Sequence, residues 1–219
     1  MKSKQLLLIG ALEHDAWEVL ETAVSLGYSP VFALFHGQKS PVDFNFIFLD
    51  ELQGLKLDLK ATVARAPQWK DLEDLRVDRF WSLRLRRQVS VAEEAGVLDW
   101  ITLVHPTASV SPSASLHPGV FAGPQVSISA ISSIGKHSRI GRGSQIGHHV
   151  KIGEFCHLGP GVVIPSEVSI GNGVTVGPGA IFLNGVQVED DSLVGAGAVV
   201  TRNVRSGEVV LGNPARPAP

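Results

Sequence analysis

Two hydrophobic patterns divide the chain. From Val110 to Val200, an apolar residue recurs at every sixth position without a shift in register. The positions are Val110, Leu116, Ala122, Ile128, Ile134, Ile140, Ile146, Ile152, Leu158, Ile164, Ile170, Val176, Phe182, Val188, Val194 and Val200. The residue four positions after each is Ala, Ser, Val or Cys, and a glycine often follows the apolar residue directly. Neither the 3.6-residue period of a helix nor the alternation of a strand produces this pattern.

A strict six-residue repeat predicts a solenoid of short strands joined by tight turns. In each repeat the large apolar side chain points inward and the small residue fills a narrow inner corner. Glycine or polar residues take the turn positions, where φ is positive. Stacked coils then bury one continuous apolar axis. Ordinary hairpins are the alternative, but they seldom keep a six-residue register, so we favour the solenoid.

Residues 1–100 lack this period and alternate between predicted strands and helices. Strands are expected at 6–10, 30–35, 44–49, 60–64 and 100–104, and helices at 15–25 and 80–96. This alternation predicts a small parallel α/β unit. We therefore expect two domains, 1–100 and 101–219, with residues 105–110 opening the solenoid.

Composition removes several classes of function. The formal net charge of −2 gives no basic surface for nucleic acid and no polybasic stretch for a membrane. Cys156 is the single cysteine, which excludes an internal disulfide framework and fits a reducing compartment. No segment approaches the roughly 20 apolar residues of a membrane span. We expect a soluble, cytoplasmic protein.

Three stretches carry a resemblance to a known family. Residues 7–14 read LLIGALEH, residues 144–161 read SQIGHHVKIGEFCHLGPG, and residues 194–204 and 212–216 read VGAGAVVTRNV and GNPAR. Together they resemble hexapeptide-repeat acyltransferases of the sialic-acid O-acetyltransferase and nucleotide-amino-sugar N-acetyltransferase family. The resemblance implies a small Rossmann-like N-terminal domain that binds the acceptor, followed by a left-handed parallel β-helix with three hexads per coil. It also implies a homotrimer with active sites between neighbouring subunits.

The resemblance assigns roles in the solenoid. His148 takes the position of the general base that removes a proton from the attacking amine or hydroxyl, a task suited to imidazole. His157, nine residues later, takes the position of the histidine that contacts acyl-CoA. The acceptor attacks the thioester directly, without a covalent enzyme intermediate. The pantetheine chain of the cofactor is expected to run past Gly195, Ala196 and Gly197, because small residues let backbone amides approach it closely.

The sequence departs from the family beside the base. The family has Asp or Glu where this chain has His149, which orients a neighbour but supplies less electrostatic stabilisation. Glu167 is expected to stack on position 149 one coil later, at about 4.8 Å, and is the candidate for the missing carboxylate. The alternative for both histidines is a pair of solvated turn residues. A zinc site is disfavoured because His148 and His149 are adjacent and no Cys or Asp joins them at ligand spacing.

A second departure lies in the first domain. The family binds the nucleotide sugar with a loop of the form Gly-Ala-x-Gly-His, and Gly10 and His14 take its first and last positions. Glu13 replaces the second glycine of that loop, and a glutamate facing a pyrophosphate would repel it. Gly10 and His14 are nevertheless the candidates for substrate binding. The alternative for Gly10 is a tight strand-to-helix turn without a ligand.

These observations predict an acyl-CoA-dependent N- or O-acyltransferase, with acetyl-CoA as the expected donor and no metal. The expected acceptor is a sugar, nucleotide-linked, in surface-polysaccharide synthesis. Two alternatives stay open. One is a catalytically silent paralogue or scaffold on the same fold, suggested by His149 and the altered Gly10 loop. The other is a γ-carbonic-anhydrase-like metal enzyme, which would need three spaced zinc histidines.

Overall fold

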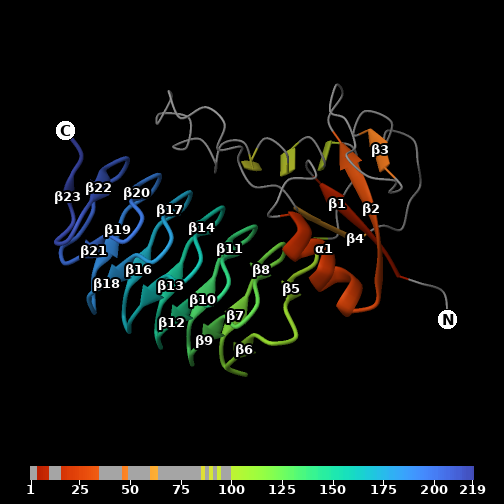
Figure 1. Cartoon of the computed structure of the whole chain (residues 1–219), viewed down its shortest axis with the longest axis horizontal. Helices are drawn as coiled ribbons and strands as arrows, with labels where there is room; N and C mark the ends of the chain where they lie inside the picture. The colour runs from red at the N-terminus through yellow and green to blue at the C-terminus, as the bar shows by residue number, and fades with distance from the viewer. Residues whose placement is uncertain are drawn as a thin grey trace.

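The chain forms an α/β unit at its N-terminal end and a long parallel β-solenoid that runs to the C-terminus (Figure 1). In this computed structural model the described residues are 4–9, 16–34, 46–48, 60–63, 85–86, 89–90, 93–94 and 100–219. The sheet of the α/β unit is parallel, with the strand order β3-β2-β1-β4. Its elements are β1 (Lys4–Ile9), α1 (Ala16–Ser25), β2 (Tyr28–Leu34), β3 (Phe46–Phe48) and β4 (Lys60–Val63).

These elements fall where the alternating pattern predicts them. Strands β1 to β4 begin and end within two residues of their expected ranges, and α1 begins one residue later than expected. The strand expected at 100–104 is shorter, Leu103–Val104, and it pairs with a strand of the solenoid instead of the α/β sheet. Of the helix predicted over 80–96, the described residues 85–86, 89–90 and 93–94 are helical, and the rest lies outside the described residues.

Three parallel sheets form the faces of the solenoid. The β13 face contains β7 (Ser115–Leu116), β10 (Ser133–Ile134), β13 (Lys151–Ile152), β16 (Ser169–Ile170) and β19 (Gln187–Val188). The β12 face contains β6 (Ser109–Val110), β9 (Ser127–Ile128), β12 (Gln145–Ile146), β15 (Val163–Ile164), β18 (Ile181–Phe182) and β21 (Val199–Val200). The β14 face contains β5 (Leu103–Val104), β8 (Phe121–Ala122), β11 (Arg139–Ile140), β14 (His157–Leu158), β17 (Thr175–Val176), β20 (Leu193–Val194), β22 (Val209–Leu211) and the antiparallel β23 (Arg216–Pro217).

Within the solenoid, each strand pairs with the strand three further along the chain, so residues eighteen apart are neighbours. Ile134 pairs with Ile152, and Ile152 pairs with Ile170. Three corners follow from this order. The His149 corner joins the β12 face to the β13 face, the Phe155 corner joins the β13 face to the β14 face, and the Gly197 corner joins the β14 face back to the β12 face.

The apolar positions of the six-residue repeat are the second residues of the two-residue strands, and from Ala122 to Val200 all of them are buried. This confirms the predicted inward orientation. The small positions four residues later do more than fill a corner. Ser138 Oγ accepts a hydrogen bond from the Cys156 amide (2.9 Å) and donates one to the Gly153 carbonyl (2.8 Å), and Ser132 and Ser144 bridge successive coils in the same way.

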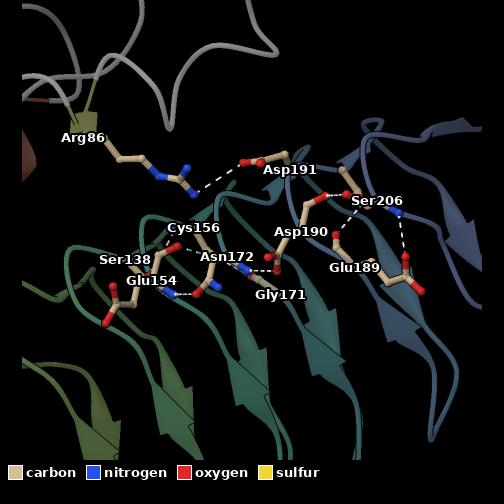
Figure 2. A network of polar contacts seen from close by, with 11 residues as sticks. Arg86, Ser138, Glu154, Cys156, Gly171, Asn172, Glu189, Asp190, Asp191 and Ser206 are labelled. Carbon is tan, nitrogen blue, oxygen red and sulfur yellow. Dashed lines mark hydrogen bonds and ion pairs between the residues drawn. The ribbon is translucent and has the colours of Figure 1, made fainter.

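Side chains along the Phe155 corner also connect successive coils (Figure 2). The side-chain oxygen Oδ1 of Asn172 accepts a hydrogen bond from the backbone amide of Glu154 (2.8 Å). The backbone amide of Asn172 donates a hydrogen bond to Asp190 Oδ1 (2.7 Å). Arg86, from the N-terminal part of the chain, pairs with Asp191 at 3.4 Å. Its guanidinium carbon also lies 5.5 Å from the centroid of the Phe155 ring.

The helical residues near Arg86 cover a buried histidine at this corner. Leu85 and Val89 pack with Trp100 and Phe155, and the ring of His137 lies between those two aromatic rings, at 4.7 and 5.1 Å. His137 is 6% exposed. Burial, with the charge of Lys136 as a lesser cause, lowers the pKa of His137 to about 4. This histidine is therefore neutral at physiological pH.

Helix α1 packs on the N-terminal end of the β14 face. Val19, Leu20 and Ala23 form a buried cluster with residues of β5 and β8. At the edge of this cluster the Glu18 carboxylate pairs with Arg139 (3.9 Å) and with Arg142. Within the described part of the chain, no helix has the length and apolar character needed to cross a bilayer.

Replacing Ser138 with alanine should lower the midpoint of thermal unfolding. The variant leaves the Cys156 amide and the Gly153 carbonyl without their partner, and an unsatisfied buried polar group costs about 1–3 kcal/mol. Circular dichroism during heating measures the effect. Ser127→Ala is the matched control, because Ser127 lies on β9 facing outward and its hydroxyl bonds to no described group. Equal midpoints for the two variants would contradict the bridging role.

Replacing His137 with phenylalanine should make the protein less sensitive to acid. The unfolded chain protonates this histidine below about pH 6.5, whereas the folded chain does so only near pH 4, so stability is lost as the pH falls between these values. At pH 5 the loss is roughly 2 kcal/mol, and phenylalanine removes it. Denaturant unfolding at pH 7.5 and pH 5 measures the difference. Phe155→Leu loses packing at both pH values and should keep the parent's pH dependence.

Candidate functional site

Two adjacent exposed histidines contact each other at the His149 corner. His148 and His149 lie in the turn between β12 and β13, with Nδ1 of one ring 2.9 Å from Nδ1 of the other. The ring centroids are 5.1 Å apart at an interplanar angle of 87°. His149 has φ of 56° and donates its amide to the Ala130 carbonyl of the preceding coil. The turn backbone therefore places the two side chains next to each other.

The short Nδ1–Nδ1 distance restricts the tautomers of a neutral pair. One ring must donate from Nδ1 while the other accepts at Nδ1 and carries its hydrogen on Nε2. If His148 donates, its Nε2 has a free lone pair and can accept a proton from a substrate. His149 then accepts the hydrogen bond that a carboxylate accepts in the family. The pair can thus supply an oriented base without an acidic neighbour.

Glu167 lies one coil later at the same corner, as expected from the eighteen-residue spacing. Its amide donates to the His148 carbonyl at 3.1 Å, and φ of Glu167 is 65°. The carboxylate is exposed and makes no hydrogen bond or ion pair with either histidine within the described ranges. That Glu167 polarises the base therefore stays a prediction.

His157 lies in strand β14 rather than in a turn, and it is half-buried on the β14 face. Its neighbours in register are Arg139 on the preceding coil and Thr175 on the next. Burial lowers the pKa of His157 to about 3, and the charge of Arg139 acts in the same direction. His157 is therefore neutral at physiological pH and can contact a ligand only as a neutral donor or acceptor.

Gly195, Ala196 and Gly197 form the turn between β20 and β21 at the Gly197 corner. The coils lie very close here: a Cβ on Gly177 would be 2.4 Å from the Ala196 nitrogen, so no side chain fits at that position. Ala196 and Gly197 are exposed, and φ of Gly197 is 64°. The corner thus presents backbone with little side chain over it, and the cofactor role of these three residues stays a prediction.

The structure separates the candidates into two groups. His157 lies in the β14 face, in the strand that leads into the Gly197 corner. Its coil is two coils before that of Gly195, so the two coils are about 10 Å apart at the usual spacing of stacked strands. His148 lies at the His149 corner, which joins the two other faces and is therefore opposite the β14 face in each coil. A single chain therefore does not bring the base to the cofactor candidates. Gly10 and His14 lie outside the described residues.

Two other kinds of chemistry have no support at this site. Burial raises the pKa of the Cys156 thiol to about 12, so this cysteine does not supply a thiolate at neutral pH. Among the described residues, no group of three His, Cys, Asp or Glu side chains is arranged to hold a metal ion.

The comparisons with known proteins agree with the repeat. The family model "Bacterial transferase hexapeptide (six repeats)" matches residues 131–166 and 167–202. No curated protein sequence gives a significant match. The hexapeptide solenoid predicted from the six-residue period is confirmed.

Three similar solved structures extend over essentially the whole chain. A mutant of perosamine N-acetyltransferase from Caulobacter crescentus, in complex with CoA and GDP-perosamine, is 26% identical, with a TM-score of 0.82 and coverage of 100% of this chain and 98% of that one. The acetyltransferase domain of PglB from Neisseria gonorrhoeae, in complex with acetyl-CoA, is 26% identical, with a TM-score of 0.85 and coverage of 99% and 100%. WeeI from Acinetobacter baumannii, 17% identical over 98% of this chain and 100% of its own with a TM-score of 0.81, shows the shared fold alone.

Proposed function

We propose that this protein is a hexapeptide-repeat acyltransferase of the nucleotide-amino-sugar N-acetyltransferase type, which transfers the acetyl group of acetyl-CoA to the amine of a nucleotide-linked sugar. The observation that carries the proposal is the exposed His148–His149 pair, whose Nδ1–Nδ1 contact can orient a base. The likeness to two acetyltransferases over essentially the full length of the chain supports the reaction class. The product would enter surface glycan synthesis.

In the proposed reaction, the Nδ1–H of His148 donates a hydrogen bond to Nδ1 of His149. Nε2 of His148 then accepts the proton of the amine. The amine nitrogen attacks the thioester carbonyl of acetyl-CoA, so a C–N bond forms while the C–S bond breaks. The protonated His148 then returns its proton to the departing CoA sulfur. His149 stabilises the transient imidazolium less than a carboxylate would, because a neutral acceptor carries no compensating charge.

The donor is proposed to lie along the edge formed by His157 and the Gly197 corner. The neutral His157 supplies a hydrogen-bonding group near the thioester. The exposed backbone of Ala196 and Gly197 receives the pantetheine arm, whose amides can bond to exposed N–H and C=O groups. No metal takes part.

A homotrimer is proposed because the base and the donor residues lie apart within one chain. With three copies around a threefold axis, the His149 corner of one subunit can face the β14 face of the next. We also propose that the solenoid is left-handed and that residues 1–100 form a Rossmann-like domain, where Gly10 and His14 bind the acceptor. Acetyl-CoA and nucleotide sugars are cytoplasmic metabolites, so we expect the reaction in the cytoplasm.

A catalytically silent relative is the second candidate, favoured by the absence of a carboxylate contact to His148 within the described residues. The direct test incubates the protein with acetyl-CoA and a panel of nucleotide amino sugars and follows release of the CoA thiol. Thiol release with an amine acceptor, absent with the hydroxyl analogue, supports N-acetyl transfer. Binding of acetyl-CoA without turnover of any acceptor would favour the silent relative.

His148→Ala should lower kcat by about 10² to 10⁴, the usual contribution of general-base catalysis. The affinity for acetyl-CoA, measured by calorimetry, should change little, because the proposed role of His148 is to accept the proton of the acceptor amine and not to bind the donor. Full activity of this variant would show that the amine arrives deprotonated and needs no base from His148.

His149→Phe and His149→Glu should separate orientation from charge. Phenylalanine removes the acceptor of the Nδ1 hydrogen bond, so kcat should fall by about tenfold or more. Glutamate restores the family's carboxylate and should preserve kcat while moving the acid limb of the pH–rate profile to higher pH, because a nearby anion stabilises protonated imidazole. Identical profiles for parent and both variants would remove His149 from the site.

His157→Gln should weaken acetyl-CoA binding while leaving kcat at saturating donor close to that of the parent. Glutamine keeps a neutral polar side chain but not the imidazole geometry. Calorimetry gives the affinity, and Lys151→Ala, exposed on the β13 face, is the control. Unchanged affinity in His157→Gln would exclude His157 from the donor site.

A further inference from the structure

A buried arginine lies between helix α1 and the proposed acetyl-CoA site. The outward positions of the first four strands of the β14 face are Leu103, Phe121, Arg139 and His157. Leu103 and Phe121 pack with α1 in a buried apolar cluster. Arg139 comes next and is only 7% exposed, with its guanidinium carbon 4.9 Å from the centroid of the Phe121 ring. A charged group therefore occupies a position at which an apolar side chain would satisfy the packing of α1.

Helix α1 supplies the counter-charge of this arginine. Oε2 of Glu18 lies 3.9 Å from Nη2 of Arg139, and the Glu18 side chain is itself only 20% exposed. Removing two charges from water is costly, and a buried ion pair is often no more stabilising than well-packed apolar residues of similar volume. Stability alone therefore does not explain why position 139 carries an arginine.

The side chain next to Arg139 on this face is His157. The two are register partners on β11 and β14, about 4.8 Å apart at the usual strand spacing. Burial lowers the pKa of His157 to about 3, and the positive charge of Arg139 is the second cause. The other register partner, Thr175, is uncharged, and α1 contributes the Glu18 carboxylate that pairs with Arg139. Because Arg139 is almost inaccessible, it acts on a ligand through His157 rather than by direct contact.

We infer that Arg139 is a positioning residue for the acetyl-CoA site, which fixes the ring of His157 and is itself fixed by Glu18 of helix α1. This inference rests on the proposed function, in which His157 contacts the donor. A guanidinium held in one place restricts the orientations open to the ring beside it, and its charge disfavours protonation of that ring. Since Glu18 belongs to the first helix of the chain, binding of acetyl-CoA depends on how α1 docks on the solenoid.

The test measures acetyl-CoA binding by calorimetry in variants of Arg139. Methionine fills a similar volume without the charge, so Arg139→Met should weaken binding about three- to tenfold, the usual effect of one lost hydrogen bond. The kcat at saturating acetyl-CoA should stay close to that of the parent. Lysine keeps the charge, so Arg139→Lys should retain most of the affinity.

Variants of Glu18 test the second step. Glu18→Gln releases the guanidinium and should also weaken acetyl-CoA binding, but it should add nothing in combination with Arg139→Met, because Glu18 acts through Arg139. Arg142→Gln is the matched control. Arg142 pairs with the same carboxylate from the exposed turn after β11, and its replacement should leave the affinity unchanged. Additive losses from Glu18→Gln and Arg139→Met would contradict the coupling.

A structural role alone predicts different results. In the ligand-free protein, the pKa of His157 measured by NMR should rise in Arg139→Met, because a nearby positive charge is gone, and should not change in Arg142→Gln. Losses of affinity that follow the unfolding temperature in all variants, Arg142→Gln included, would overturn the inference. If Arg139→Met does not fold, the comparison of Glu18→Gln with Arg142→Gln decides in the same way.

Failure of the proposed function gives a separate result. If the parent does not bind acetyl-CoA, the proposed function fails, and the NMR titration without ligand still tests Arg139. A higher pKa of His157 in Arg139→Met than in the parent would support the action of Arg139 on the ring, and an equal pKa would refute it.

Discussion

The close stacking of coils eighteen residues apart is the constraint on which the rest of this structure depends. Parallel strands of only two residues make few hydrogen bonds each, so the turns must also meet from coil to coil. At Gly177 the next coil comes so near that a Cβ would be 2.4 Å from the Ala196 nitrogen. Buried Ser138 joins two coils through one hydroxyl that both donates and accepts. Small residues and inward hydroxyls therefore fix the spacing that the apolar axis alone would leave loose.

Because the register never shifts, the equivalent turn residues of successive coils stack in a column at each corner. A functional site at a corner can therefore draw its residues from several coils. At the Phe155 corner the column is covered by Leu85, Val89 and Trp100, and it serves the attachment of the N-terminal part of the chain. At the Gly197 corner the column is mostly backbone. The His149 corner combines Ile131, His149 and Glu167 on three successive turns, all with positive φ. The Phe155 corner also carries non-glycine residues with positive φ, but its His137 is buried, whereas Ile131, His149 and Glu167 are all exposed.

The sequence predicts the solenoid, the inward positions and the parallel order of the first strands, because period and alternation are properties of the chain itself. It also places His148 and His149 in one turn and Glu167 one coil later. It does not give the Nδ1–Nδ1 contact, which depends on ring orientation. It also does not indicate that His157 is half-buried, because burial at an outward strand position depends on the side chains that pack around it. The bridging serines look like filler in the sequence because a hydroxyl's partners lie fifteen and eighteen residues away.

The replacement of a carboxylate by His149 changes how a base can be held rather than whether one is present. A carboxylate carries no hydrogen that must first be placed on another atom, so it accepts a hydrogen bond from the Nδ1–H of its neighbour directly, and it also stabilises the imidazolium. A histidine accepts only when its own proton is on Nε2, so the two rings must choose tautomers together. Once one ring takes up a proton, the pair shares a positive charge at an exposed turn, where water rather than the protein stabilises it. The His148–His149 pair therefore offers the acceptor a base that is oriented, but whose protonated form receives less electrostatic stabilisation than a carboxylate would give.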